Sequence, residues 1–199
     1  MPRPADPKAK EKLLDAAQRL MLGKGYAATS VEAVCEAADL TKGAFFHYFE
    51  DKEALGHAAV SRFVERGAAS FRDAPFLREA DPLRRALGFV DHMIDLVRSG
   101  PEGCLVGMFT LELADTHPRI RKLCARTFDT WSDTLRALLD AAKVRYAPRA
   151  RVDTRALALH FFAVFEGALL LRRAIGRKDV VTSSLLLYRD HLERLFTRR

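Results

Sequence analysis

Hydrogen-bond donors are interleaved with aromatic side chains in the stretch TKGAFFHYFEDKEAL, residues 41–55. Lys42 and His47 can donate to the edges of bases or to phosphate oxygens, while Tyr48 and Lys52 are spaced to hold a sugar-phosphate backbone. A buried histidine or tyrosine would need polar partners, so these residue types are hard to explain as core. Their spacing favours a helix that faces a groove of nucleic acid.

The remaining residues of this stretch fit the same helix. At 3.6 residues per turn, Phe45 and Phe49 share one stripe, and we expect both to pack inward against neighbouring helices. Gly43 weakens a short helix by roughly 1 kcal/mol, which argues for another role. Gly43 and Ala44, at the start of the helix, would let its backbone approach bases closely.

Two elements must precede this helix to support it. Apolar residues recur at helical spacing over residues 8–22, and Gly23 or Gly25 can end that helix in a left-handed conformation. The following Thr29-Ser30-Val31-Glu32 has the form of a capping box, with Thr29 at the N-cap and Glu32 three residues later.

Thr41 can cap the third helix, which must be brief because Glu50-Asp51 is a fresh acidic start before Lys52. Two short helices separated by three or four residues, with a longer helix in front, match the outline of a helix-turn-helix. We therefore expect residues 1–52 to form a DNA-binding domain of this type.

Longer amphipathic segments follow, and we expect residues 53–199 to form a helical bundle for ligand binding and dimerisation. Asp81-Pro82 is a strong helix start, an N-cap residue followed by proline at the first helical position. Strand-like alternation is missing, so the chain is predicted to be all-α, with about nine helices. The further expected segments are residues 103–114, 118–148, 153–175 and 182–196.

Composition narrows the function classes. The 199 residues carry a net charge of +7, yet residues 1–52 hold eight basic and eight acidic side chains, so bulk charge supports DNA binding only weakly. No apolar signal core or membrane-spanning run is present, and a cytoplasmic protein is expected. The three cysteines lack paired spacing, which argues against disulfides and zinc, and no metal or cofactor is predicted.

The whole run from Gly25 to Leu55 resembles the N-terminal DNA-binding region of the TetR family of transcriptional regulators. The matching features are Gly25-Tyr26, Thr29, Val31, Ala37, Lys42-Gly43, an aromatic pair, His47, Phe49 and Lys52-Glu53-Leu55. The resemblance implies a homodimer whose two recognition helices enter successive major grooves of a palindromic operator. It places Thr29 and Ser30 at a phosphate, Thr41, Lys42, Gly43, Ala44 and His47 near bases, and Phe46, Tyr48 and Lys52 along the backbone. Family members usually have tyrosine where this chain has Phe46, so that hydroxyl contact is absent.

Residues 103–121, GCLVGMFTLELADTHPRIR, look similar to the subgroup that includes AcuR- and NemR-type regulators. Cys104 lies at an expected helix start, where unpaired N–H groups can lower a thiol pKa, so it is either a sensor thiol or an inert buried one. A small-molecule pocket is expected in the bundle, although each candidate is also explained as ordinary core. The candidates are Met93, Val97, Cys104, Met108, Phe109, Phe128, Trp131, Phe161 and Phe165.

The family pairs its last two helices with their two-fold mates, and we expect dimerisation through residues 153–175 and 182–196. Folding back on the chain's own bundle is the alternative for these side chains. The predicted interface residues are Leu159, Phe162, Glu166, Leu169, Leu170, Leu185, Leu192 and Leu195.

Motifs of common enzymes, among them GxGxxG, the Walker loop, HExxH and GxSxG, are missing, and no catalytic residue is predicted. We predict a ligand-responsive regulator, a repressor released from its operator by a small-molecule effector. The alternatives are a helical small-molecule-binding protein without operator specificity, and a protein that binds DNA without sequence preference.

Overall fold

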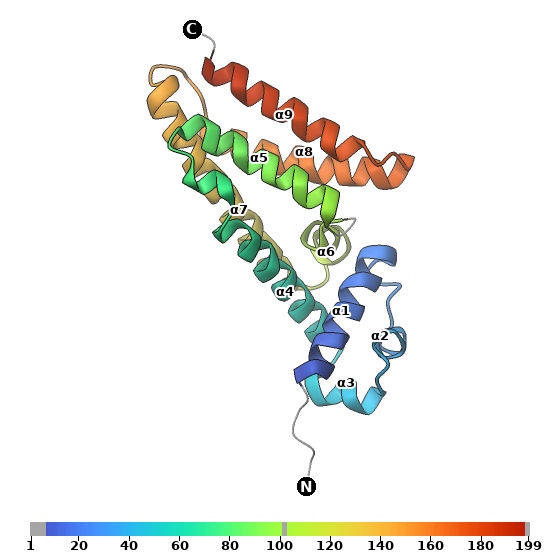
Figure 1. Ribbon diagram of the computed structural model, residues 1–199. Coiled ribbons are helices and arrows are strands. Elements are labelled where there is room, and N and C mark those ends of the chain that lie inside the picture. Colours follow the sequence, from blue (N-terminus) through green and yellow to red (C-terminus); the bar gives the residue numbers. More distant parts are fainter. Residues whose placement is uncertain (1–6, 101–102, 198–199) are drawn as a thin grey trace. The chain divides into compact units, whose positions relative to one another are not determined.

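The computed structural model describes residues 7–100 and 103–197, and within these two ranges the chain is helical with no β-strand (Figure 1). Nine α-helices and one 3₁₀ turn lie in the described part, which confirms the all-α prediction. In order they are α1 Pro7–Lys24, α2 Val31–Ala38, α3 Lys42–Tyr48, α4 Lys52–Arg72, η1 Pro75–Arg78, α5 Pro82–Ser99, α6 Leu105–Leu113, α7 Pro118–Tyr146, α8 Thr154–Ile175 and α9 Val180–Thr197.

The described chain divides into two compact units. The first holds residues up to 69 together with 103–125, and the second holds residues 70–100 and 126–197. These two units are defined by packing. The boundary predicted from the sequence, between residues 52 and 53, separates a DNA-binding domain from a ligand-binding domain, and it stays a prediction. That predicted boundary lies at the start of α4.

The core of the first unit forms where α1 packs on α2, α3 and α6. Helical spacing in each of these short segments brings an apolar stripe to one side, and burying these stripes stabilises helices too short to persist alone. The largest of its fully buried side chains are Leu13, Met21, Phe45, Leu55, Leu105, Phe109 and Ile120.

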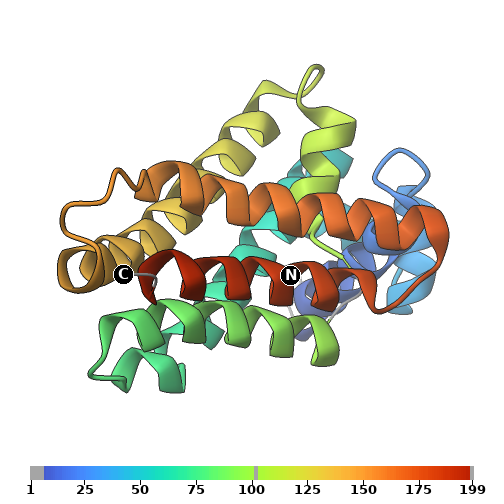
Figure 2. The same cartoon turned by 90° about the horizontal axis from the view of Figure 1, so that it is seen from above.

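In the second unit, α9 lies between α5 and α8 (Figure 2). Phe161 of α8 is fully buried, with its ring centroid 5.5 Å from that of Phe89 and 5.3 Å from that of Tyr188. Asp81 caps α5 and Pro82 takes its first turn, as predicted from the sequence. The bundle is therefore built around aromatic contacts between three helices.

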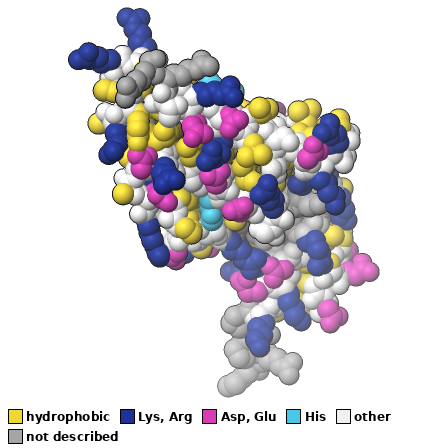
Figure 3. All heavy atoms as spheres, turned by 45° about the horizontal axis from the view of Figure 1, so that its top comes forward, with side chains coloured by type: hydrophobic (Ala, Val, Ile, Leu, Met, Phe, Trp, Pro, Cys, Tyr) yellow, Lys and Arg dark blue, Asp and Glu magenta, His cyan; other side chains and the backbone are white. Residues whose placement is uncertain are grey.

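On the face shown in Figure 3, apolar side chains occur in small groups between lysine, arginine and acidic residues. α8 is the one helix of the described chain that is long and apolar enough to cross a membrane, a property that core helices of soluble bundles share. Its partial burial against α9 fits such a bundle.

Candidate nucleic-acid interface

α3 is a seven-residue helix whose two ends are fixed by local contacts. The Thr41 hydroxyl oxygen accepts a hydrogen bond from the Ala44 N–H at 3.1 Å, which confirms Thr41 as its N-cap. Phe45 is fully buried and Phe49 is 5% exposed, with ring centroids 5.7 Å apart. These two phenylalanines therefore hold the helix to the first unit, as their spacing predicts.

The opposite side of α3 is open to solvent and gathers the residues predicted to contact bases. Lys42, Gly43 and His47 are exposed and Ala44 is partly exposed. A Cβ atom at Gly43 would meet only the Thr41 hydroxyl oxygen, at 3.7 Å, so packing within the chain does not require glycine there. The small residue is better explained by the approach of something outside the chain.

Two further aromatic side chains lie beside this face. Phe46 is 58% exposed, and its ring meets Phe45 edge-on at 5.1 Å. Tyr48 is partly exposed and contacts the His47 ring, also edge-on, at 5.0 Å. An exposed phenylalanine offers apolar surface but no hydrogen bond, so Phe46 can contact sugars or a thymine methyl but cannot donate to phosphate.

The start of α2 differs from the capping box predicted for it. Ser30 is the N-cap, and its hydroxyl oxygen accepts from the Ala33 N–H at 3.1 Å. Thr29 is fully buried, and its hydroxyl donates to the Gly25 carbonyl at 2.7 Å. The structure thus corrects the N-cap role predicted for Thr29, whose side chain braces the preceding turn. Its contact with a phosphate stays a prediction. Ser30 remains exposed.

An ion pair joins α2 to α3. The Lys42 ammonium contacts the Glu32 carboxylate, and both side chains remain more than half exposed. Lys42 lowers the pKa of Glu32, with smaller contributions from the backbone N–H of Glu32 and the Ser30 hydroxyl. The negative charge of Glu32 therefore lies beside Ser30 and Lys42, both of which are predicted to contact DNA.

The turn between α1 and α2 is held by a side chain from far along the sequence. Glu112 of α6 accepts hydrogen bonds from the backbone N–H of Tyr26 at 3.1 Å and of Ala27 at 3.0 Å. Gly25, rather than Gly23, ends α1, because its φ of +89° is the left-handed conformation. Charged acceptors make strong hydrogen bonds, so this carboxylate fixes the turn in place.

Lys52, predicted to contact the DNA backbone, approaches the same turn from the start of α4. Its ammonium donates to the Ala27 carbonyl at 3.3 Å and lies 4.2 Å from the centre of the Tyr26 ring. Partial burial lowers the pKa of Lys52, and Glu112 opposes that shift. Lys52 thus has a structural role in the free protein, whatever it contacts in a complex.

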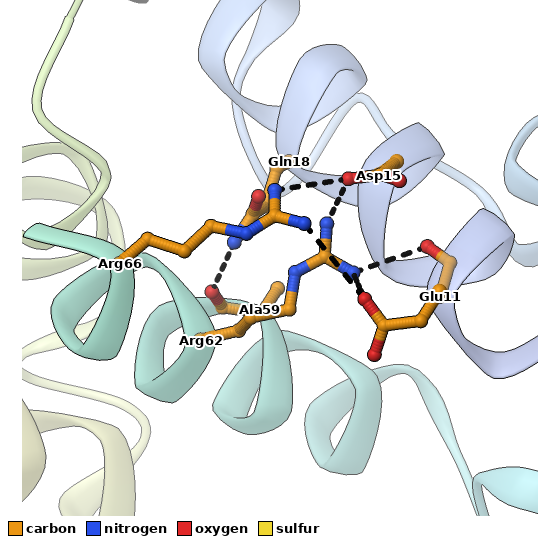
Figure 4. A network of polar contacts seen from close by, with 6 residues as sticks. All are labelled: Glu11, Asp15, Gln18, Ala59, Arg62 and Arg66. Carbon is orange, nitrogen blue, oxygen red and sulfur yellow. Dashed lines mark hydrogen bonds and ion pairs between the residues drawn. The ribbon is translucent and has the colours of Figure 1, made fainter. Parts of the chain in front are cut away.

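A network of polar contacts ties α1 to α4 (Figure 4). Arg62, only 8% exposed, donates to the Glu11 carboxylate at 2.6 Å and to its carbonyl at 3.1 Å, and it also contacts Asp15. Arg66 reaches Asp15 at 3.1 Å. Beside them the Gln18 side chain donates to the Ala59 carbonyl at 2.7 Å, so the long helix that carries Lys52 is locked to α1.

Known families match both parts of the chain. Residues 13–59 match the model of bacterial regulatory proteins of the tetR family, and residues 82–185 match the tetracyclin repressor-like C-terminal domain. The second match alone covers more than half of the 199 residues. The chain belongs to the TetR family of transcriptional regulators. Members of this family bind DNA and respond to ligands, typically as dimers, so the protein is a ligand-responsive regulator and not an enzyme.

Individual TetR-family proteins are similar over most of their length. The transcriptional repressor DhaR of Mycobacterium sp. strain GP1 is 24% identical over 81% of this chain and 80% of its own. The regulator AcuR of Cereibacter sphaeroides is 28% identical over 92% of this chain and 84% of its own, which agrees with the resemblance seen in residues 103–121. The crystal structure of a TetR regulatory protein from Rhodobacter sphaeroides superposes with a TM-score of 0.79 at 28% identity, covering 92% and 98% of the two chains.

The predicted ligand-binding residues fall into both compact units. Cys104, Met108 and Phe109 belong to the first, whereas Met93, Val97, Phe128, Trp131, Phe161 and Phe165 belong to the second. In the second unit the Trp131 ring stacks on Phe162, with centroids 6.0 Å apart and planes at 23°, and Phe128 meets Trp131 edge-on at 5.8 Å. Phe128 and Trp131 are partly exposed, which suits a ligand contact better than the buried Phe161 does.

Cys104 is the N-cap residue of α6, at the helix start where the sequence predicts it. Its side chain is 4% exposed, so solvent reagents cannot reach the sulfur in this conformation. Cys35 and Cys124 are also buried, and burial raises the pKa of both thiols. All three cysteines therefore match an inert thiol better than a reactive one.

The residues predicted at the dimer interface divide by exposure. Leu159 and Leu170 are about half exposed, while Glu166, Leu169 and Leu195 are partly exposed. Phe162, Leu185 and Leu192 are buried within their own unit, which favours the alternative that these three side chains fold back on the chain's own bundle. Their part in an interface stays a prediction. Four further large apolar residues of these helices are exposed, and the sequence analysis did not include them among the interface candidates. They are Leu171, Ile175, Leu186 and Leu187.

Two shallow recesses mark the surface of the second unit. One of about 360 Å³ lies between α8 and α9 and is lined by His160, His191 and Leu195 among others. The other, of about 280 Å³, lies between α7 and α8 and includes Ser132, Arg155 and Leu159. The predicted ligand residues line neither recess, so that pocket stays a prediction.

Proposed function

We propose that this TetR-family regulator is a cytoplasmic repressor that binds a palindromic operator as a homodimer and is released by a small-molecule effector. The observation that carries the proposal is the exposed side of α3, with Lys42, Gly43 and His47 outward and Phe45 buried beneath them. In this proposal the residues near bases are Thr41, Lys42, Gly43, Ala44 and His47, and those along the backbone are Ser30, Phe46, Tyr48 and Lys52. Family membership does not favour either alternative function.

Footprinting on the DNA that flanks the protein's own gene tests the operator. A protected palindrome is expected, with half-sites about one helical turn apart. His47→Ala should relax preference at particular base pairs, whereas Lys52→Ala should weaken binding to all sequences and reduce the salt slope by about one unit. Equal wild-type affinity for the flanking DNA and for random duplexes would contradict the proposal.

Dimerisation is assigned to the exposed leucines of α8 and α9. Leu170 is 59% exposed, and a carboxylate there would be desolvated in an apolar interface. Leu170→Glu should give a monomer in sedimentation velocity and lose operator binding, because one reading helix spans only a half-site. Val144→Glu is the control, since Val144 is 76% exposed near the end of α7. A dimeric Leu170→Glu protein would place the interface elsewhere.

The effector is assigned to the aromatic cluster of the second unit and is expected to carry apolar or aromatic surface. Trp131 is the chain's single tryptophan, so its fluorescence reports binding directly. Compounds that change this fluorescence should also release the protein from its footprint. A compound that releases the protein with no change in Trp131 emission would move the pocket away from this cluster.

A further inference from the structure

Glu32 and Lys42 form the one ion pair between side chains of α2 and α3 among the described residues. Glu32 is the second residue of α2, and Lys42 is the first residue of α3. Their side chains are 61% and 57% exposed, so the pair lies at the surface rather than in the core. Exposed ion pairs add little to the stability of a fold, so stabilisation is a weak explanation for this one.

Lys42 is the only lysine or arginine in α3. Residues 1–52 carry equal numbers of basic and acidic side chains, so the attraction of this region for a phosphate backbone depends on where each charge lies. With Glu32 beside it, the Lys42 charge is already compensated in the free protein. A phosphate that binds Lys42 brings its own negative charge close to the Glu32 carboxylate, and the repulsion between these two anions opposes the contact.

A base edge makes a different demand on the pair. The lysine ammonium has three donors, so Lys42 can keep one on Glu32 and direct another to the O6 or N7 of guanine. The Glu32 carboxylate, also in contact with Ser30, can itself accept from the N4 amino group of cytosine. Contact with a neutral base edge is therefore compatible with the intact pair, whereas contact with a phosphate is opposed by the charge of Glu32.

We infer that Glu32 is a specificity-determining residue: by pairing with Lys42 it suppresses binding through phosphate contacts and directs Lys42 toward base edges. The inference rests on the proposed function, because it requires α3 to lie in a groove of operator DNA. It assigns to an acidic residue of α2 a role in discrimination between operator and bulk DNA.

Glu32→Gln removes the charge and keeps the size of the side chain. Its affinity for a random-sequence duplex should rise about fivefold near 0.1 M salt, with the salt dependence steeper by about one phosphate contact. Affinity for the footprinted operator should rise less or fall, so the ratio of specific to non-specific affinity should drop at least threefold. Fluorescence anisotropy with both duplexes over a series of salt concentrations measures these quantities.

Glu36→Gln is the matched control, because Glu36 is an exposed glutamate on the same helix that makes no ion pair with Lys42. Removing this charge should change both affinities alike and leave their ratio intact. An unchanged ratio in Glu32→Gln, or the same change in both variants, overturns the inference. A wild-type protein that fails to prefer the operator defeats the proposed function instead, so the two failures are distinguishable.

A double-mutant cycle between Glu32→Gln and Lys42→Gln isolates the pair from the separate effects of the two charges. Once Lys42 is gone, removing Glu32 should raise affinity for the random duplex by less than twofold. An undiminished fivefold gain would mean that Glu32 acts as a repulsive charge independent of Lys42, which also overturns the inference.

Discussion

A carboxylate oxygen of Glu112 occupies the space where a side chain at Gly25 would begin: a Cβ atom there would lie 2.5 Å from Glu112 Oε1. The positive φ of Gly25 requires glycine, and a side chain there would also push the Glu112 carboxylate away from the two amides that it binds. The turn that sets the direction of α2 depends on a residue of α6.

Replacing Glu112 with Ala should loosen this turn. The Tyr26 and Ala27 N–H groups would lose a charged acceptor, and the free energy of unfolding should fall by about 1 to 2 kcal/mol. Hydrogen exchange of these two amides should accelerate in Glu112→Ala and stay unchanged in Asp115→Ala, which removes an exposed acid just beyond α6. Equal exchange in all three proteins would show that water satisfies the turn as well as Glu112 does.

Substitutions at the two glycines near the end of α1 should act in opposite directions. Gly25→Ala must adopt the left-handed conformation against Glu112, and we expect a loss of about 2 kcal/mol in the free energy of unfolding. A Cβ at Gly23, inside α1, meets nothing within 4 Å, so Gly23→Ala should gain about 0.5 kcal/mol from helix propensity. Urea unfolding of both variants measures the difference, and a neutral Gly25→Ala would mean that the turn can rearrange.

The two arginines of α4 that reach α1 should differ in importance. Arg62 is buried and holds both Glu11 and Asp15, whereas Arg66 contacts the same acids with its side chain 58% exposed. Arg62→Ala should lower the free energy of unfolding by about 2 kcal/mol, and Arg66→Ala by less than about 0.5 kcal/mol. Urea unfolding checks both values. Similar losses in the two variants would show that charge, rather than burial, decides the contribution.

Alkaline pH should destabilise the fold through Tyr26. Burial, followed by the charges of Glu53 and Asp51, raises the pKa of Tyr26 from 10.0 to about 12. The folded state therefore keeps the phenol proton longer, so this contribution is complete below pH 10 and is lost as the pH rises toward 12. Urea unfolding of Tyr26→Phe should show roughly 2 kcal/mol less decline across this window than wild type. Because Tyr188 is present in both proteins, the difference isolates Tyr26, and parallel declines would contradict the assignment.

Local chemistry explains why much of α3 could be predicted. The Thr41 cap and the inward pair Phe45 and Phe49 depend only on residue type and helical period, and the structure has both. The predicted N-cap of α2 was wrong because Thr29 and Ser30 are adjacent hydroxyl residues and either could cap the helix. The Thr29 hydroxyl donates to the Gly25 carbonyl instead, and Ser30 is the cap.

Contacts between residues that are far apart in the sequence could not be predicted. Glu112 lies 86 residues from Tyr26, and no periodicity links an acid in an apolar stretch to a distant turn. Arg62 lies 51 residues from Glu11 and sits in a helix whose pattern gives no sign of a buried charge. On α8 and α9, apolar residues surround much of each helix, so spacing alone could not separate the inner Leu192 from the outer Leu187.

Because two amides of the α1–α2 turn are bound by a side chain of α6, the predicted DNA-binding domain, residues 1–52, is not a transferable module on its own. A chimaera that joins residues 1–52 to the ligand-binding part of another regulator would contain the turn at Gly25 but lack Glu112, the acceptor for its two amides. Such exchanges between regulators should succeed only when the recipient supplies an acid at the position of Glu112, or when α6 of this protein is transferred together with residues 1–52.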